Sequence, residues 1–140
     1  MTTITPYLLY EDAAAAITWL GRAYGFTETL RYTTPEGRVS HAELAVGDGT
    51  VMLGEPGGDY RSPRVTGHVH SFLHVTVDDV DAHCEAARAA GATILSEPQD
   101  TSYGLRGYRS VDLEGHRWDF ATVLREVAPE EWGATSAGAR

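Results

Sequence analysis

The sequence is poor in several features that would define common classes of protein. Cys84 is the only cysteine among 140 residues, so no disulfide can form within the chain. A reducing cytoplasm is therefore the expected location. Lysine and arginine together number 11 against 20 aspartate and glutamate residues, which gives a formal net charge of −9. Nucleic acid is not expected as a partner, because phosphate binding favours a basic surface.

Long apolar runs are also missing. None approaches the roughly 20 residues that cross a bilayer, so no membrane partner is expected. The first residues, MTTITPYLLYED, lack the basic stretch that opens a signal peptide. The remaining composition, with 42% hydrophobic and 22% charged residues, is typical of one globular domain with a sizeable core.

The chain contains two similar halves. Residues 8–26, LLYEDAAAAITWLGRAYGF, resemble residues 75–93, VTVDDVDAHCEAARAAGAT. Each stretch has a short apolar strand, an acidic pair, a helix of about a dozen residues and a glycine. An aspartate precedes each helix as its N-cap, which predicts helices near Asp12–Tyr24 and Asp79–Ala90.

Three strands are expected after each helix, so that each half is a β-α-β-β-β module. Aligning the two hairpins, GDGTV and LEGHR, places Gly49 opposite Gly115. One such module has too little buried face to stand alone, so the two should pack together. We expect one domain over residues 1–124, with modules at about 3–56 and 68–124 and a Gly/Pro-rich linker at about 57–67. The tail, residues 125–140, is expected to fray.

Two stretches make the sequence similar to a known family. YGLRGYRSVDLEGHRWDFA (103–121) and HAELAVGDGTVMLGE (41–55) resemble the vicinal oxygen chelate superfamily, in its glyoxalase and bleomycin-resistance branch. The resemblance covers about residues 4–123. It implies an α+β fold in which two β-α-β-β-β modules form a cup of curved mixed sheet, the glyoxalase/bleomycin resistance/dioxygenase fold.

Metal enzymes of that family carry one ligand on the first and last strand of each module. Counting from the aspartate before each helix and from each hairpin glycine gives four corresponding positions: Thr5, Leu53, Phe72 and Asp119. Leucine and phenylalanine cannot coordinate a metal, and neutral threonine is a poor ligand. No metal and no cofactor are therefore expected. A displaced metal site made by His41, Glu43 and His74 remains an alternative.

Strand alternation suggests which side chains face the cup. The candidate ligand-binding residues are Tyr7, His41, Glu43, Phe72, His74, Tyr103, Arg109 and Asp119. A carboxylate in such a strand is normally paired, and Arg109 or Arg117 is the expected partner of Asp119. Trp118 and Phe120 have the opposite parity and should pack beneath a helix. We expect His83 on a helix surface and Glu114 in an exposed hairpin.

These features predict a metal-independent small-molecule-binding protein of the bleomycin-resistance type. Its cup would sequester an aromatic or natural-product-like ligand, and the acidic balance of the chain favours a cationic or neutral one. The alternative is an enzyme of the same fold, a lyase or isomerase related to glyoxalases or dioxygenases, with His41 or His74 as acid/base. A homodimer is expected, because an open cup exposes apolar walls.

Overall fold

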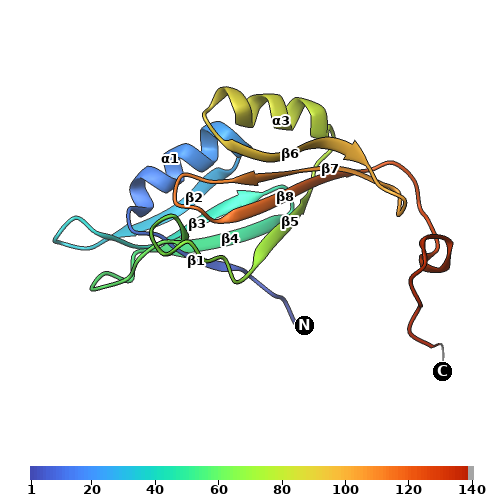
Figure 1. Ribbon diagram of the computed structural model, residues 1–140. Coiled ribbons are helices and arrows are strands. Elements are labelled where there is room, and N and C mark those ends of the chain that lie inside the picture. The colour runs from blue at the N-terminus through green and yellow to red at the C-terminus, as the bar shows by residue number, and fades with distance from the viewer. Residues whose placement is uncertain (139–140) are drawn as a thin grey trace.

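Two four-stranded sheets lie side by side, and the two long helices cover the same side of both (Figure 1). This computed structural model describes residues 1–138. The first half consists of β1 (Tyr7–Leu9), α1 (Ala13–Tyr24), β2 (Thr27–Thr33), β3 (Val39–Val46) and β4 (Gly49–Gly54). The second half consists of β5 (Phe72–Thr76), α3 (Val80–Ala89), β6 (Thr93–Asp100), β7 (Leu105–Val111) and β8 (Arg117–Val123). The short α2 (Pro63–Thr66) joins the halves, and the 3-10 turn η1 (Pro129–Trp132) follows β8.

The repeated β-α-β-β-β order confirms the predicted α+β fold. The sheets have the same strand orders, β1-β4-β3-β2 and β5-β8-β7-β6, and in each the first strand is parallel to the last. The predicted caps are present: Asp12 Oδ1 accepts the backbone N–H of Ala15 at 3.0 Å, and Asp79 Oδ1 accepts that of Ala82 at 3.1 Å. These bonds satisfy amides that a helix start leaves free.

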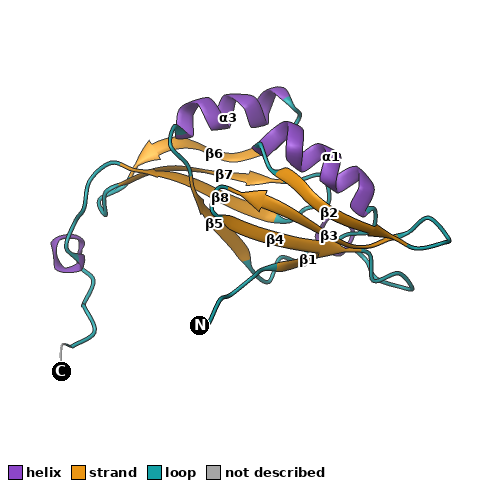
Figure 2. Ribbon diagram, turned by 180° about the vertical axis from the view of Figure 1, so that it is seen from behind, coloured by secondary structure: helices purple, strands orange, loops and turns teal. Residues whose placement is uncertain are grey.

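The core lies between the sheets and the helices. Trp118 and Phe120 are fully buried there, as their parity in the strand predicts, and Cys84 packs as a small buried thiol. The other sides of the sheets face away from α1 and α3 (Figure 2). Large side chains on those open faces stay accessible: Tyr7 is 47% and Phe72 is 49% exposed. No helix among residues 1–138 is long and apolar enough to cross a membrane.

The predicted register of the first hairpin is wrong. Strands β3 and β4 pair up to Val46 and Gly49, around the two-residue turn Gly47-Asp48, whereas the second hairpin turns over five residues, 112–116. The shorter turn moves β4 by one position relative to the sequence alignment. A one-residue change reverses the face on which each side chain lies. Met52 therefore has the place that Asp119 has in the second sheet, and Leu53 is fully buried in the core.

Glu114 and His83 were expected at the surface, and both expectations are wrong. Glu114 is only 3% exposed, and its carboxylate accepts the backbone N–H groups of Glu11 at 2.6 Å and Asp12 at 2.9 Å. The second-half hairpin thereby holds the start of α1. His83 is partly buried between the helices and β7, with its ring nitrogens 2.7 Å from Tyr108 Oη and 3.1 Å from Tyr24 O.

Candidate ligand-binding site

The first half places a tyrosine, a histidine and a glutamate in one hydrogen-bonded chain on its open face. Tyr7 Oη lies 2.8 Å from His41 Nδ1, and His41 Nε2 lies 2.9 Å from Glu43 Oε2. Glu43 accepts from Nε2–H, which leaves Nδ1 to accept the Tyr7 hydroxyl proton. Gly54 makes room for this contact, since a Cβ there would lie 3.0 Å from Tyr7 Oη and 2.3 Å from Ser40 O. These linked hydrogen bonds can hold a proton at Tyr7 Oη or move it to His41.

Asp119 occupies the middle of the second open face, and its charge is compensated. Its carboxylate accepts from Arg117 Nε at 3.1 Å and lies 3.6 Å from Arg109 Nε. Arg117 also stacks over the Phe72 ring, with its guanidinium carbon 4.5 Å from the ring centroid. The predicted ion pair is therefore present, with Arg117 as the nearer partner. Two arginines against one aspartate leave this face with a local charge of about +1.

A cavity of about 370 Å³ opens on this second face. It is lined by Phe72, His74, Ser96, Gln99, Thr101, Tyr103, Leu105, Gly107, Tyr108, Arg109, Asp119, Phe120 and Ala121. Gly107 has the place that His41 has in the first half, and its missing side chain contributes to the space. The Arg109 side chain is 57% exposed, and its only ion pair among residues 1–138 is the long one to Asp119. Its outer N–H groups can therefore meet a ligand.

The eight candidate residues fall into two groups instead of one. Tyr7, His41 and Glu43 belong to the first sheet, whereas the other five line the second-sheet cavity, which no residue of the first group lines. Within one chain, the cavity on the second face therefore gathers five of the eight candidate residues. The displaced metal site also does not form, since the described residues contain no group of three or more His, Cys, Asp and Glu placed to hold a metal ion.

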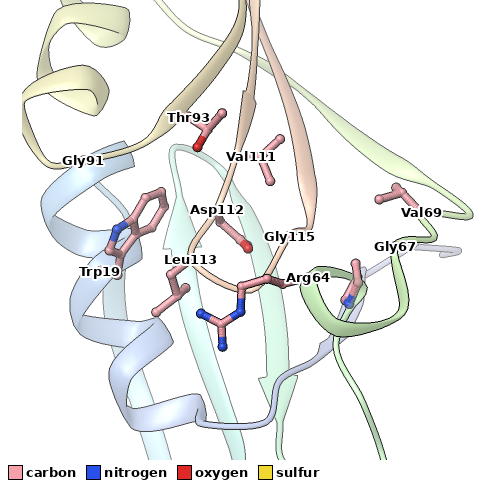
Figure 3. Close-up of a pocket in the computed structure, with 11 residues that line it drawn as sticks. Trp19, Arg64, Gly67, Val69, Gly91, Thr93, Val111, Asp112, Leu113 and Gly115 are labelled. Carbon is pink, nitrogen blue, oxygen red and sulfur yellow. The ribbon is translucent and has the colours of Figure 1, made fainter.

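A different cavity, of about 440 Å³, lies beside the second hairpin (Figure 3). Trp19 of α1 and Arg64 of α2 approach it from two sides (Figure 3). Its buried carboxylate, Asp112, is already used, because it accepts from Tyr10 Oη at 2.7 Å and from Trp118 Nε1 at 3.0 Å. The bond from Tyr10 joins the two halves, whereas the bond from Trp118 lies within the second half. We assign this cavity to the seam between the modules and not to ligand binding.

The fold and the matched region define the class of this protein. The family model of the Glyoxalase/Bleomycin resistance protein/Dioxygenase superfamily matches residues 3–120, and the chain belongs to that family. Its sequence is similar to an uncharacterized protein of Mycobacterium bovis, with 35% identity over 133 residues that cover 91% of this chain and 88% of the relative. An uncharacterized protein of Mycobacterium tuberculosis has the same identity over 91% of this chain and 78% of its own.

Among solved structures, TioX from Micromonospora sp. ML1 is similar, with 39% identity and a TM-score of 0.73 over 89% of this chain and all of that one. A glyoxalase/bleomycin resistance protein/dioxygenase from Nocardioides shares the fold at 19% identity, with a TM-score of 0.66 over 92% of this chain and 87% of its own.

The residues at the metal positions of this family do not fit a metal ion. With the register corrected, those positions hold Thr5, Met52, Phe72 and Asp119. The only carboxylate among them is engaged by two arginines. A divalent metal requires several nitrogen or oxygen donors, and this set offers one such group and one neutral hydroxyl. Sequence reasoning missed the roles of Met52, Gly54 and Gly107, although the length of the VGDGT turn signalled the shift in β4.

Proposed function

We propose that this chain is a metal-independent small-molecule-binding protein of the bleomycin-resistance type, which holds an aromatic ligand at the second open face. The observation that carries this proposal is the cavity of about 370 Å³ that combines aromatic walls with a guanidinium group available for hydrogen bonding. Phe72 and Tyr103 offer ring faces, and Arg109 offers N–H donors. Small-molecule sites typically combine such apolar walls with a few fixed polar groups.

The local charge selects a different ligand from the one that the net charge favours. Arg109 and Arg117 outweigh Asp119 at this face, although the whole chain is acidic. Short-range charges dominate here, because salt screens exposed charges beyond about 10 Å at ordinary ionic strength. We therefore assign to the site a ligand that carries a planar ring and an anionic or hydrogen-bond-accepting group, with Arg109 as the group that recognises it.

A second copy of the chain would complete the cup. The first face carries exposed Tyr7, Leu30 and Tyr32 beside Glu43, and the second carries exposed Phe72 beside Arg109. Apolar areas with opposite local charges suit a two-fold dimer in which the first face of one copy meets the second face of the other. Sedimentation equilibrium should give a dimer at micromolar concentration, and a monomer would contradict this assembly.

Calorimetric titration with anthraquinone-2-sulfonate tests ligand binding, since this probe has fused rings and one anionic group. We expect Arg109→Gln to weaken its binding roughly tenfold, the usual loss for a hydrogen bond to a charged group. Arg106→Gln is the matched control: Arg106 lies on the same strand, but pairs with Asp81 and Asp100 outside the cavity. Treatment with a metal chelator should not change the affinity of the parent or of either variant for the probe. Failure of the parent protein to bind at millimolar probe would contradict the proposed function.

A second candidate function is supported by the hydrogen-bonded chain on the first face. In a lyase or isomerase, Tyr7 Oη would take a proton from an acidic carbon of the substrate while its own proton passes to His41 Nδ1. Glu43 would stabilise the imidazolium, as the carboxylate does in a serine hydrolase triad. His41, and not His74, is the candidate acid/base, because among residues 1–138 it is His41 that forms this chain.

Deuterium incorporation into hydroxyacetone in D₂O, followed by proton NMR, tests this candidate. Exchange that the parent accelerates and that Tyr7→Phe abolishes would support it. Equal exchange by the parent, Tyr7→Phe and His41→Gln would contradict proton abstraction through this chain.

A further inference from the structure

The segment after β8 forms a turn that is fixed by its own hydrogen bonds. Glu131 accepts the N–H of Ala128 at 3.1 Å, and Glu130 accepts both the N–H and the hydroxyl of Ser136, at 2.9 and 2.7 Å. Gly133 ends the turn with a φ of 96°, which a glycine adopts without strain. Fraying was predicted for the tail as a whole, and within that tail this turn has hydrogen bonds of its own. An internally bonded turn presents its central side chain in a defined place.

That side chain is Trp132, and it packs against the loop at the rim of the cavity. The Trp132 and Tyr103 rings are 5.2 Å apart between centroids and tilted by 53°. Gly104, next to Tyr103, fixes the approach: its carbonyl accepts the N–H of Leu124 at 2.8 Å, and a Cβ there would lie 2.3 Å from Arg125 O. In both views η1 lies beyond the β6–β7 loop, on the side of the sheet away from α3 (Figures 1 and 2).

Burial alone does not explain why a tryptophan stands here. Trp132 and Tyr103 are each 44% exposed, so their contact leaves much of both rings accessible. Trp118, by contrast, is fully buried. Tryptophan gains stability from burying its large apolar surface, and an accessible one beside a cavity is a typical contact for a flat ligand. Tyr103 lines the cavity, so Trp132 extends the same aromatic surface outward.

We propose that Trp132 and Tyr103 form an aromatic subsite for the outer rings of a fused-ring ligand. This inference rests on the proposed binding function and names the ligand class more closely. A ligand with one ring fits between Phe72 and Tyr103 with its acceptor group at Arg109. Additional fused rings extend past Tyr103 and stack on Trp132. The C-terminal turn thus sets the preference for polycyclic over monocyclic ligands.

Two probes with the same anionic group test the subsite by calorimetric titration: benzenesulfonate, with one ring, and anthraquinone-2-sulfonate, with three. Trp132→Ala should weaken anthraquinone-2-sulfonate roughly three- to tenfold, the usual range for one aromatic contact. It should leave benzenesulfonate unchanged. Trp132→Phe should restore most of the loss, and Trp19→Phe, outside the cavity, is the control. Anthraquinone-2-sulfonate should quench part of the tryptophan fluorescence of the parent, and this quenching should be absent in Trp132→Phe.

Each other outcome contradicts a defined claim. If neither probe binds the parent, the proposed binding function fails and the subsite fails with it. If Arg109→Gln weakens both probes but Trp132→Ala weakens neither, the binding function stands and the subsite is wrong. If Trp132→Ala weakens the binding of both probes equally, Trp132 has a general structural role and the subsite is wrong. Dissociation of a dimer by Trp132→Ala would make Trp132 an interface residue and would also overturn the subsite.

Discussion

The two halves use the same strand order to present different chemistry on their open faces. Across the four strands, the first half has Tyr7, Met52, Glu43 and Leu30 in one row, where the second has His74, Asp119, Arg109 and Ser96. In the first half, Tyr7 and Glu43 of this row are both hydrogen-bonded to the neighbouring His41, so their polar groups already have partners. In the second, Gly107 leaves space and Arg109 keeps donors available.

This difference shows how a repeat can separate stability from function. The helix side of each sheet is largely apolar. Leu44 and Leu53 in the first half have the places of Ser110 and Phe120 in the second, and Trp118 is buried beside them. Among the strand residues that the structure describes, Ser110 is the fully buried polar one, and its hydroxyl oxygen lies 2.7 Å from Tyr24 Oη. The buried sides therefore build one core, whereas the open sides are free to differ. The second open face has a cavity beside the Arg109 guanidinium, and the first has the hydrogen bonds that link Tyr7, His41 and Glu43.

The hairpins offer the strongest test of the comparison. Glu114→Ala would leave the N–H groups of Glu11 and Asp12 without their acceptor, and we expect a loss of about 3–5 kcal/mol in the free energy of unfolding. Asp48→Ala changes the exposed turn of the first hairpin and should stay within about 0.5 kcal/mol. Urea denaturation measures both. Similar values for the two variants would show that the second hairpin does not hold α1.

Gly54 and Ala121 occupy matching places, and exchanging the residue should have a larger effect at Gly54 than at Ala121. Gly54→Ala puts a methyl group against Ser40 O and Tyr7 Oη, so a loss of about 1–3 kcal/mol is expected, as for other overpacked sites. Nitrogen NMR should then show that His41 Nδ1 no longer accepts the Tyr7 hydroxyl proton. Ala121→Gly removes a methyl group at the second face and should cost only about 1 kcal/mol. An unchanged His41 signal in Gly54→Ala would refute the role given to Gly54.

The ion pairs of Asp119 have no counterpart at Met52 and can be weighed by double-mutant cycles. The coupling energy of Asp119 with Arg117 should be about 1 kcal/mol, because the pair is short and the side chains are only 16% and 27% exposed. That with Arg109 should be about 0.3 kcal/mol, since 57% of the Arg109 side chain is exposed and the pair is longer. Asp119→Asn, Arg117→Gln, Arg109→Gln and the double variants give both values. A stronger coupling with Arg109 would mean that this side chain is not free to bind a ligand.

Local patterns predicted the fold, and contacts between distant residues decided what they missed. The caps Asp12 and Asp79 and the alternation around Trp118 depend on neighbours in sequence, so the helices and the buried face of β8 could be read directly. Glu114 meets Glu11 and Asp12 more than 100 residues away, which no periodicity encodes. Single residues changed the expected site as well. Because the Gly47-Asp48 turn is short, Met52 and not Leu53 lies on the open face of β4.

The separation of the candidate residues also could not be read from the sequence. Parity predicts that Tyr7 and His74 face away from the helices, and both do, but parity does not fix how the two sheets are placed relative to each other. Side-by-side sheets with α1 packed against α3 put the two faces apart within one chain. Trp132 lies in a segment of small and polar residues, where composition alone favoured a frayed tail.

The smallest expected effect concerns the helices, where His83 and Ala16 have matching places, each four residues after its N-cap. Burial lowers the pKa of His83 from its ordinary value, and the hydrogen bond from Nε2 to Tyr24 O offsets this only in part. The neutral ring donates from Nε2 and accepts the Tyr108 hydroxyl proton at Nδ1. Protonation at Nδ1 would break that arrangement inside the core.

The folded chain consequently binds a proton at His83 less readily than the unfolded chain does. The stability that neutral His83 contributes is complete above the unfolded pKa of about 6.5 and is lost as the pH falls toward the lower folded pKa. His83→Gln keeps a donor and an acceptor but does not titrate, so its free energy of unfolding should fall less steeply between pH 7 and pH 5 than that of the parent. Ala15→Gln, at an exposed position of α1, should leave the parent slope unchanged. Urea denaturation at several pH values measures the slopes, and equal slopes for the parent and His83→Gln would show that His83 titrates as it does in the unfolded chain.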